Sequence, residues 1–295
     1  MFRERLKQSA TPITYEAWSP RGCDVNQHLQ AVAKFKDKLD AVNIPDNPLS
    51  ALRVSSVAYA KIVMDHLKTD AIPHINCRDR NLLALQSDIL GAHLLGIRNL
   101  FIISGDKPLG RQKKAKGVWE VTSAELCKIV KSLNEGFAYY NEGLIKINGK
   151  TGFFVGGAVV FDRKNEVKII SKKVEAGFDF FQSQITFDPE TMLNFFQEAE
   201  KEGLIINKPV LVGLSPQPSE KALNKVLKFL HTKIPDRSLN KLKRSDDFAN
   251  ELMIMCLEIA DEVKSALSPK YKIGFHIMPL GRDDLGRKLV EELRR

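Results

Sequence analysis

Polar and ionisable residues stand where several short apolar runs of this chain end. His74 lies within the run Ile72–Cys77, and Asp106 follows Gly105 at the end of the run Asn99–Ser104. An apolar helical segment of about five turns separates the two runs, at the α-helical repeat of about 3.6 residues per turn. This is the pattern of a β-α-β unit whose chemistry lies at the carboxyl ends of parallel strands. In α/β barrels that edge carries the active site.

Other residues have two interpretations each. Glu16, in Ile-Thr-Tyr-Glu-Ala-Trp, is a carboxyl group among apolar residues; burial would raise its pKa and suit a general acid, whereas a rim position would leave it ordinary. His74 is either a site residue or a hydrogen-bonded core histidine. Arg78, at a helix start, suits a phosphate or pairs with an acid. The glycines at 156 and 157 suit barrel packing or the approach of a flat ring to the backbone.

The inventory favours a cofactor-dependent enzyme over a hydrolase. No Cys-His or Ser-His-Asp set is evident, so a cofactor would carry the difficult chemistry. The four cysteines, at positions 23, 77, 127 and 256, are scattered and contain no Cys-x-x-Cys pair. A metal site and a disulfide framework are therefore not expected, and a reducing, cytoplasmic setting is predicted.

The dominant pattern is an alternation of β-type runs with segments of helical periodicity. Strands are predicted at 13–19, 41–45, 72–77, 99–104, 153–160, 178–185, 209–213 and 271–278. Helices are predicted at 25–39, 49–67, 82–95, 122–133 (capped by Ser123), 166–175, 189–201, 220–231, from 248 onward and at 283–293. Eight such units favour one (β/α)8 barrel domain over 1–295, with a hairpin-like insertion at 137–152. A doubly wound sheet is the alternative, but no Gly-x-Gly-x-x-Gly follows a strand.

The charge of the chain limits the classes of partner that it is expected to bind. The net charge is +9, but the basic residues are spread out, with the densest runs at 107–116 and 241–244. Such runs are solvated loops or attract an anionic small ligand. No aromatic-interleaved platform for nucleic acid is present. The longest apolar run, 153–161, is too short to cross a membrane as a helix, and the amino-terminal residues do not form a signal peptide.

Several separated motifs together resemble the methylenetetrahydrofolate reductase family. They are His-Ile-Asn-Cys-Arg-Asp-Arg-Asn at 74–81, Ala-Leu-Gln-Ser-Asp-Ile-Leu-Gly at 84–91 and Gly-Ile-Arg-Asn-Leu-Phe-Ile-Ile-Ser-Gly-Asp at 96–106. Further matches lie at 173–177, 182–188, 210–213 and 274–278, in the same order. The resemblance runs from about residue 12 to the end. It implies a flavin-binding barrel that reduces a methylene-tetrahydropterin to its methyl form.

The resemblance also implies roles for individual residues. Glu16 matches the family's general acid, which assists opening of the imidazolidine ring. Asp106 matches the aspartate between flavin and pterin, and Gln184 matches the glutamine that contacts the pterin. The expected flavin-binding residues are His74, Gly157, Ala158 and Lys173, together with Arg78 and Asp106. FAD is favoured over FMN.

Two departures from the family pattern concern the electron donor. The turn after the second predicted strand is Pro45-Asp46-Asn47-Pro48, where NADH-oxidising members often carry a Thr-Tyr-Gly-Ala-type turn. The aromatic residue that such enzymes place beyond the seventh strand is absent from Ser215–Ser219. The chain resembles the branch with the Asp-Asn-Pro turn and the Cys-Arg-Asp-Arg-Asn motif, in which NAD(P)H oxidation is not assured.

Three alternatives therefore stay open. The donor is either NAD(P)H or a partner electron-transfer protein. The substrate is either folate or a related modified tetrahydropterin. The third alternative concerns activity: the barrel binds a pterin without reducing it. A homo-oligomer is compatible with the sequence.

Overall fold

Eight parallel strands close into a barrel in the order β1-β10-β9-β8-β7-β4-β3-β2. The computed structural model describes residues 1–107, 115–141, 143–230 and 232–295. The strands are β1 (Ile13–Glu16), β2 (Ala41–Ile44), β3 (Ala71–Asn76), β4 (Asn99–Ile103), β7 (Phe154–Val159), β8 (Phe180–Ile185), β9 (Val210–Leu214) and β10 (Ile273–Ile277). The predicted (β/α)8 barrel is confirmed, since every neighbouring pair is parallel and β1 closes the sheet against β10.

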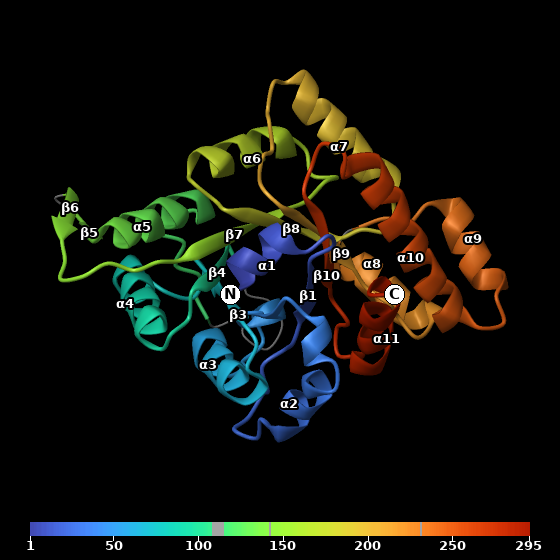
Figure 1. Cartoon of the computed structure of the whole chain (residues 1–295), viewed down its shortest axis with the longest axis horizontal. Helices are drawn as coiled ribbons and strands as arrows, with labels where there is room; N and C mark the ends of the chain where they lie inside the picture. Colours follow the sequence, from blue (N-terminus) through green and yellow to red (C-terminus); the bar gives the residue numbers. More distant parts are fainter. Residues whose placement is uncertain (108–114, 142, 231) are drawn as a thin grey trace.

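Helices surround this barrel on its outer side (Figure 1). They are α2 (Asn26–Ala33), α3 (Ser56–Leu67), α4 (Leu82–Leu94), α5 (Ser123–Glu135), α6 (Glu166–Glu175), α7 (Pro189–Lys201), α8 (Glu220–Leu230), α10 (Phe248–Leu267) and α11 (Asp283–Leu293). Their apolar stripes pack on the outward strand residues and form the larger hydrophobic core. In α5, for example, Leu126, Val130 and Leu133 are fully buried on one face.

Several predicted helix boundaries were wrong. The helix predicted at 49–67 begins at Ser56, because Asn47, Leu49 and Ser50 have positive φ and form a turn. The helix predicted at 25–39 ends at Ala33 and is followed by a short 3-10 turn.

Two further helix features differ from the sequence prediction. The cap of α5 is Thr122 rather than Ser123: the Thr122 hydroxyl accepts from the Glu125 backbone, and Glu125 accepts from Thr122 in return. The predicted polar connection before α10 contains a further helix, α9 (Asp236–Arg244).

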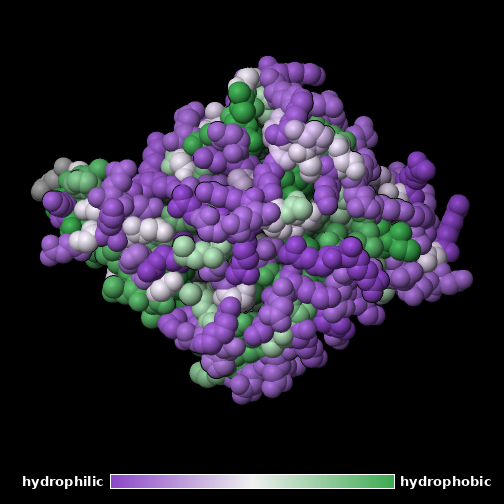
Figure 2. Space-filling model, viewed as in Figure 1, coloured by the Kyte–Doolittle hydropathy of each residue, from purple (hydrophilic) through white to green (hydrophobic). Residues whose placement is uncertain are grey.

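A short amino-terminal helix, α1 (Phe2–Gln8), closes the amino end of the barrel and was not predicted. It lies over the barrel centre in Figure 1, and its outer face is hydrophilic in Figure 2. Phe2 and Leu6 are buried in a separate inner core with Ala41, Ile72, Phe101, Phe180 and Leu211. The Phe2 ring packs edge-on against Phe180, with ring centroids 5.4 Å apart. The helix therefore seals one end of the barrel.

The predicted insertion at 137–152 is confirmed as a hairpin. Strands β5 (Phe137–Tyr140) and β6 (Gly143–Lys146) pair antiparallel and project beyond α5 at the left of Figure 1. Within the described part of the chain, no helix combines the length and apolar character that a membrane crossing would need.

Candidate active site

The barrel interior changes from apolar to polar along several strands, as β3 and β8 show. In β3, Ile72 faces the sealed end and His74 lies two residues further along; in β8, Phe180 is followed in the same way by Gln182. Successive side chains of a strand alternate between its faces, so residues two apart share the interior. The carboxyl ends therefore form a polar floor above an apolar base.

A chain of hydrogen bonds crosses this floor. The Gln182 amide donates to the Thr14 hydroxyl over 3.3 Å, and that hydroxyl lies 2.9 Å from His276 Nδ1. Asn43 joins the two histidines: its Nδ2 lies 3.4 Å from His276 Nδ1, and its Oδ1 lies 3.3 Å from His74 Nε2. Five strands thus contribute to one network. Within the described residues, the buried Gln182 Oε1 has no partner and is available to a ligand.

Both histidines of the floor are neutral. Burial lowers the pKa of His74 and of His276 to about 3. Each neutral ring therefore has one N–H. The Asn43 oxygen can only accept, so His74 Nε2 donates to it. The Asn43 nitrogen can only donate, so His276 Nδ1 accepts and its Nε2 carries the hydrogen.

Glu16 lies above this floor, at the end of β1. It is 9% exposed, and burial raises its pKa to about 7. The Trp18 indole donates to Glu16 Oε1 over 2.7 Å, and Glu16 Oε2 lies 4.0 Å from His276 Nε2. The indole hydrogen bond and the nearby Arg53 charge oppose the rise in pKa, but burial dominates. The raised pKa predicted for this carboxyl is confirmed, and near pH 7 both its protonated and its ionised forms are populated.

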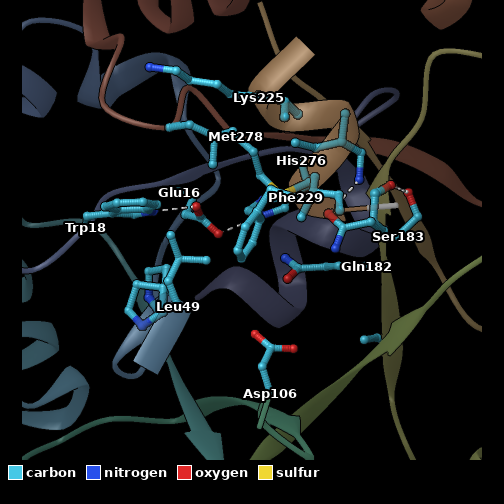
Figure 3. A pocket seen from close by; sticks show the side chains of 18 of the residues that line it. Glu16, Trp18, Leu49, Asp106, Gln182, Ser183, Lys225, Phe229, His276 and Met278 are labelled. Carbon is cyan, nitrogen blue, oxygen red and sulfur yellow. Dashed lines mark hydrogen bonds and ion pairs between the residues drawn. The ribbon is translucent and has the colours of Figure 1, made fainter. Parts of the chain in front are cut away.

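These groups border a cavity of about 920 Å³ at the carboxyl ends of the strands. Glu16, Gln182 and Asp106 approach it from different sides in Figure 3. Among the residues predicted for the site, five line the cavity: Glu16, His74, Asp106, Ala158 and Gln184. The sequence therefore identified residues from five different strands or strand ends that the fold brings together.

Asp106 and Gln184 differ from Glu16 in their surroundings. Asp106 is exposed and follows Gly105, whose φ is +81°. A β-carbon at Gly105 would lie 2.8 Å from the Arg78 Cβ, so both the backbone conformation and the space require glycine. Gln184 lies at an irregular point of β8, and its Oε1 accepts from the Ile185 backbone over 2.9 Å. Its amide nitrogen remains for a ligand.

Three other predicted residues do not line the cavity. Lys173 is buried, and its ammonium donates to the carbonyl oxygen of Ala158. A side chain at Gly157 would meet the Phe178 ring, on the side of the strand that packs against the helices. Arg78 is 3% exposed and paired with Asp79 over 2.6 Å. In this structure these three residues lie outside the cavity lining, and their role in binding a flavin stays a prediction.

The Cys-Arg-Asp-Arg-Asn motif holds the Asp-Asn-Pro turn. Arg78 donates to the Asn47 carbonyl, the Ser50 hydroxyl and the Asp106 carbonyl. Arg80 pairs with the buried Asp46 over 2.6 Å. The Cys-Arg-Asp-Arg-Asn motif and the Asp-Asn-Pro turn are therefore in direct contact.

Sequence reasoning missed other residues of the site. Thr14 and Asn43 are single polar residues in apolar strands, and the two-residue alternation could have assigned both to the interior. Phe229, from α8, lines the cavity, although no aromatic residue lies in Ser215–Ser219. Lys225, from the same helix, lies at the mouth of the cavity. An exposed lysine on a helix has no sequence feature that distinguishes it from other surface lysines. Among the described residues, no group of His, Cys, Asp and Glu could hold a metal ion.

Comparisons with known proteins indicate the family of this chain. The family model described as methylenetetrahydrofolate reductase matches residues 1–294. The 5,10-methylenetetrahydrofolate reductase of Escherichia coli is 22% identical over 304 residues, covering 99% of this chain and 95% of that protein. Methylenetetrahydrofolate reductase 2 of Schizosaccharomyces pombe is 25% identical over 243 residues, covering 76% of this chain. The match spans 36% of the length of the yeast protein.

A solved structure has the same fold. It is a Clostridium thermocellum protein described as binding two copies of 5-methyl-5,6,7,8-tetrahydrofolic acid. The TM-score is 0.74 at 17% identity, covering 100% of this chain and 99% of that one. Since the family model extends over almost every residue, the chain belongs to the methylenetetrahydrofolate reductase family.

Proposed function

We propose that this protein reduces a 5,10-methylene-tetrahydropterin, with folate as the leading candidate, to its 5-methyl form with a bound flavin. The observation that carries the proposal is Glu16, a carboxyl group with a pKa raised to about 7 on a cavity lined by family-matched residues. A general acid is most effective when its pKa lies near the working pH.

The residues present fit a flavin. The cavity offers apolar walls, small Ala158 on β7, and the unpartnered oxygen of Gln182 as an acceptor for a ring N–H. The bound flavin would supply the hydride. FAD is preferred to FMN because cations at the mouth could contact the longer molecule, and His74, Ala158 and Asp106 are the residues proposed to contact it.

Glu16 would act on the pterin. In its protonated form it gives a proton to a nitrogen of the imidazolidine ring, and the adjacent C–N bond breaks to leave the reactive iminium carbon. The burial of Glu16 limits the access of water to this proton. Gln184 would hold the pterin through its free amide nitrogen. Asp106 would lie between flavin and pterin, where its negative charge favours the cationic iminium.

The mouth of the cavity suits an anionic substrate. Lys221, Lys225 and Lys228 of α8 and Arg282 line it, are exposed, and form no ion pair with the described residues. The carboxylates of a folate are the matching chemistry. The Clostridium thermocellum protein, described as binding a methyltetrahydrofolic acid, supports the same substrate class here.

The anaerobic visible spectrum of flavin-loaded protein, before and after addition of 5-methyltetrahydrofolate, tests the proposal. This reverse half-reaction needs no electron donor. We expect the flavin band to bleach in wild type and to persist in Glu16→Gln. A wild-type band that persists with 5-methyltetrahydrofolate would contradict folate as the substrate.

The electron donor is a second question, and a partner electron-transfer protein is the alternative to NAD(P)H. The segment 215–219 contains no aromatic residue for stacking a nicotinamide, but Phe229 lines the same cavity from α8. Anaerobic addition of NADH or NADPH separates the two, since rapid flavin reduction in the isolated protein would exclude a required partner. All four cysteines are free, which is compatible with a cytoplasmic setting.

A further inference from the structure

The hydrogen bond between Trp18 and Glu16 is one-directional. An indole N–H can donate a hydrogen bond but cannot accept one. In the 2.7 Å contact, Glu16 Oε1 is therefore always the acceptor. The carbonyl oxygen of a protonated carboxyl group is its stronger acceptor. The contact therefore favours the form in which Oε1 is the carbonyl oxygen and Oε2 carries the proton.

The indole is itself held in place. The Arg53 guanidinium lies over the Trp18 ring, 4.4 Å from its centroid. Arg53 donates from its side chain to the Ser19 carbonyl over 2.6 Å and from its backbone to Asn47 Oδ1 over 3.0 Å. Trp18 thus contacts both a fixed cation and the carboxyl group of Glu16 (Figure 3 shows Trp18 and Glu16).

The second carboxyl oxygen is left for the ligand. Glu16 Oε2 lies 4.0 Å from His276 Nε2, which is longer than a hydrogen bond. His276 Nε2 carries a hydrogen in the assignment fixed by Asn43, so it cannot take the Glu16 proton. The proton on Oε2 therefore has no competing acceptor in these contacts and faces the cavity that Glu16 lines.

We propose that Trp18 is a positioning residue that selects which oxygen of Glu16 carries the transferable proton, and that Arg53 holds the indole for this task. Its part in catalysis rests on the proposed function. The hydrogen bond and its response to protonation do not, so they can be tested in the protein without flavin or pterin.

The first experiment uses Trp18 fluorescence. The chain has two tryptophans, so Trp119→Phe leaves Trp18 as the sole emitter. We expect its emission to change with pH around a midpoint near 7, the pKa of Glu16, and to lose that transition in Trp119→Phe/Glu16→Gln. The other titratable or charged groups at Glu16 are His276, Arg53 and Tyr15. Burial lowers the pKa of His276 to about 3 and raises that of Tyr15, and an arginine side chain stays protonated in proteins.

The second experiment uses turnover. Trp18→Phe keeps a ring beneath Arg53 but removes the donor; Trp119→Phe is the matched control. Losing one hydrogen bond to an ionisable group should lower kcat about tenfold with little change in KM. It should also move the alkaline limit of kcat to higher pH, because the bond normally lowers the pKa of Glu16.

The two experiments separate the two proposals. A fluorescence transition that survives Glu16→Gln, or a Trp18→Phe enzyme with unchanged kcat and unchanged pH limit, would overturn the role of Trp18. Failure of pterin to bleach the flavin while the fluorescence transition behaves as expected would count against the proposed function alone.

Discussion

The two ends of the barrel interior are built from the same strands and have opposite characters. At the amino end, Phe2 and Phe180 lie in an apolar inner core with Ala41, Ile72, Phe101 and Leu211. At the carboxyl end, Thr14, Asn43 and His276 form a hydrogen-bonded floor. In β3 and β8, only two positions along the strand separate the apolar end from the polar end.

The contrast shows how one barrel divides its tasks. The apolar end can be packed to full density because nothing must enter it, whereas the polar end keeps its groups neutral by burial and leaves room for a ligand. Each substitution below changes one end of the barrel.

Glu16→Gln should have the largest effect and should act on the carboxyl end alone. Gln keeps the shape and can accept from Trp18, but it has no proton to give. Loss of a general acid typically costs about 10²- to 10⁴-fold in rate. Single-turnover flavin oxidation by methylene-tetrahydrofolate measures it. Flavin affinity, followed by absorbance titration, should be retained; a variant with full turnover would remove Glu16 from its proposed role.

Phe2→Ala should act on the opposite end. Phe2 is fully buried against Phe180 and Phe154, so its truncation leaves a cavity and should cost about 3–5 kcal/mol of unfolding free energy. Urea denaturation measures this loss. Lys7→Ala, on the exposed face of the same helix, is the control and should cost much less. Equal losses in the two variants would mean that the burial of Phe2 is not what stabilises this end of the barrel.

The raised pKa of Glu16 should make the stability of the protein depend on pH. The folded state holds the proton up to about pH 7, but the unfolded chain releases it near pH 4.5. Stability should therefore fall as pH rises from about 4.5 to 7, by on the order of 3 kcal/mol at about 1.4 kcal/mol per pKa unit. The difference in unfolding free energy between wild type and Glu16→Gln, measured across this range, isolates the contribution. A constant difference would refute it.

Lys225→Glu should have the smallest effect, because the side chain is exposed and its charge is screened. We expect KM for a folate substrate to rise a few-fold, with kcat unchanged, and the rise to shrink at high salt. Lys264→Glu, on α10 and not among the residues that line the cavity, supplies the control. If KM at low salt equals that of wild type, the mouth of the cavity does not bind the anionic part of the substrate.

Much of this contrast could be predicted from the sequence. The alternation of strands and helices indicated the barrel, and polar residues at strand ends located Glu16, His74 and Asp106. Helix α1 was not predicted, because Phe2 and Leu6 alone do not form a pattern distinct from an exposed terminus. Only the closed barrel creates the apolar opening into which they fit.

The missed parts of the site have a similar cause. The register between strands decides whether Gly157 and Lys173 lie inside or outside the barrel. Lys173 contacts Ala158 from outside. Phe229 is brought to the cavity by the direction of α8, which residue spacing does not specify. Positions set by tertiary packing rather than by local pattern are the ones that the sequence could not assign.

The closure of the barrel by β1 and β10 has a consequence for how the protein becomes active. Thr14 and His276 are hydrogen-bonded neighbours although 262 residues separate them in the chain. Contacts of such sequence separation form late, because the intervening chain must first be ordered. Until β10 docks, one side of β1 is an open edge, and the wall that shields Glu16 is incomplete. The carboxyl group should then titrate as an ordinary glutamate, so the proton donor should come into existence only in the last stage of folding.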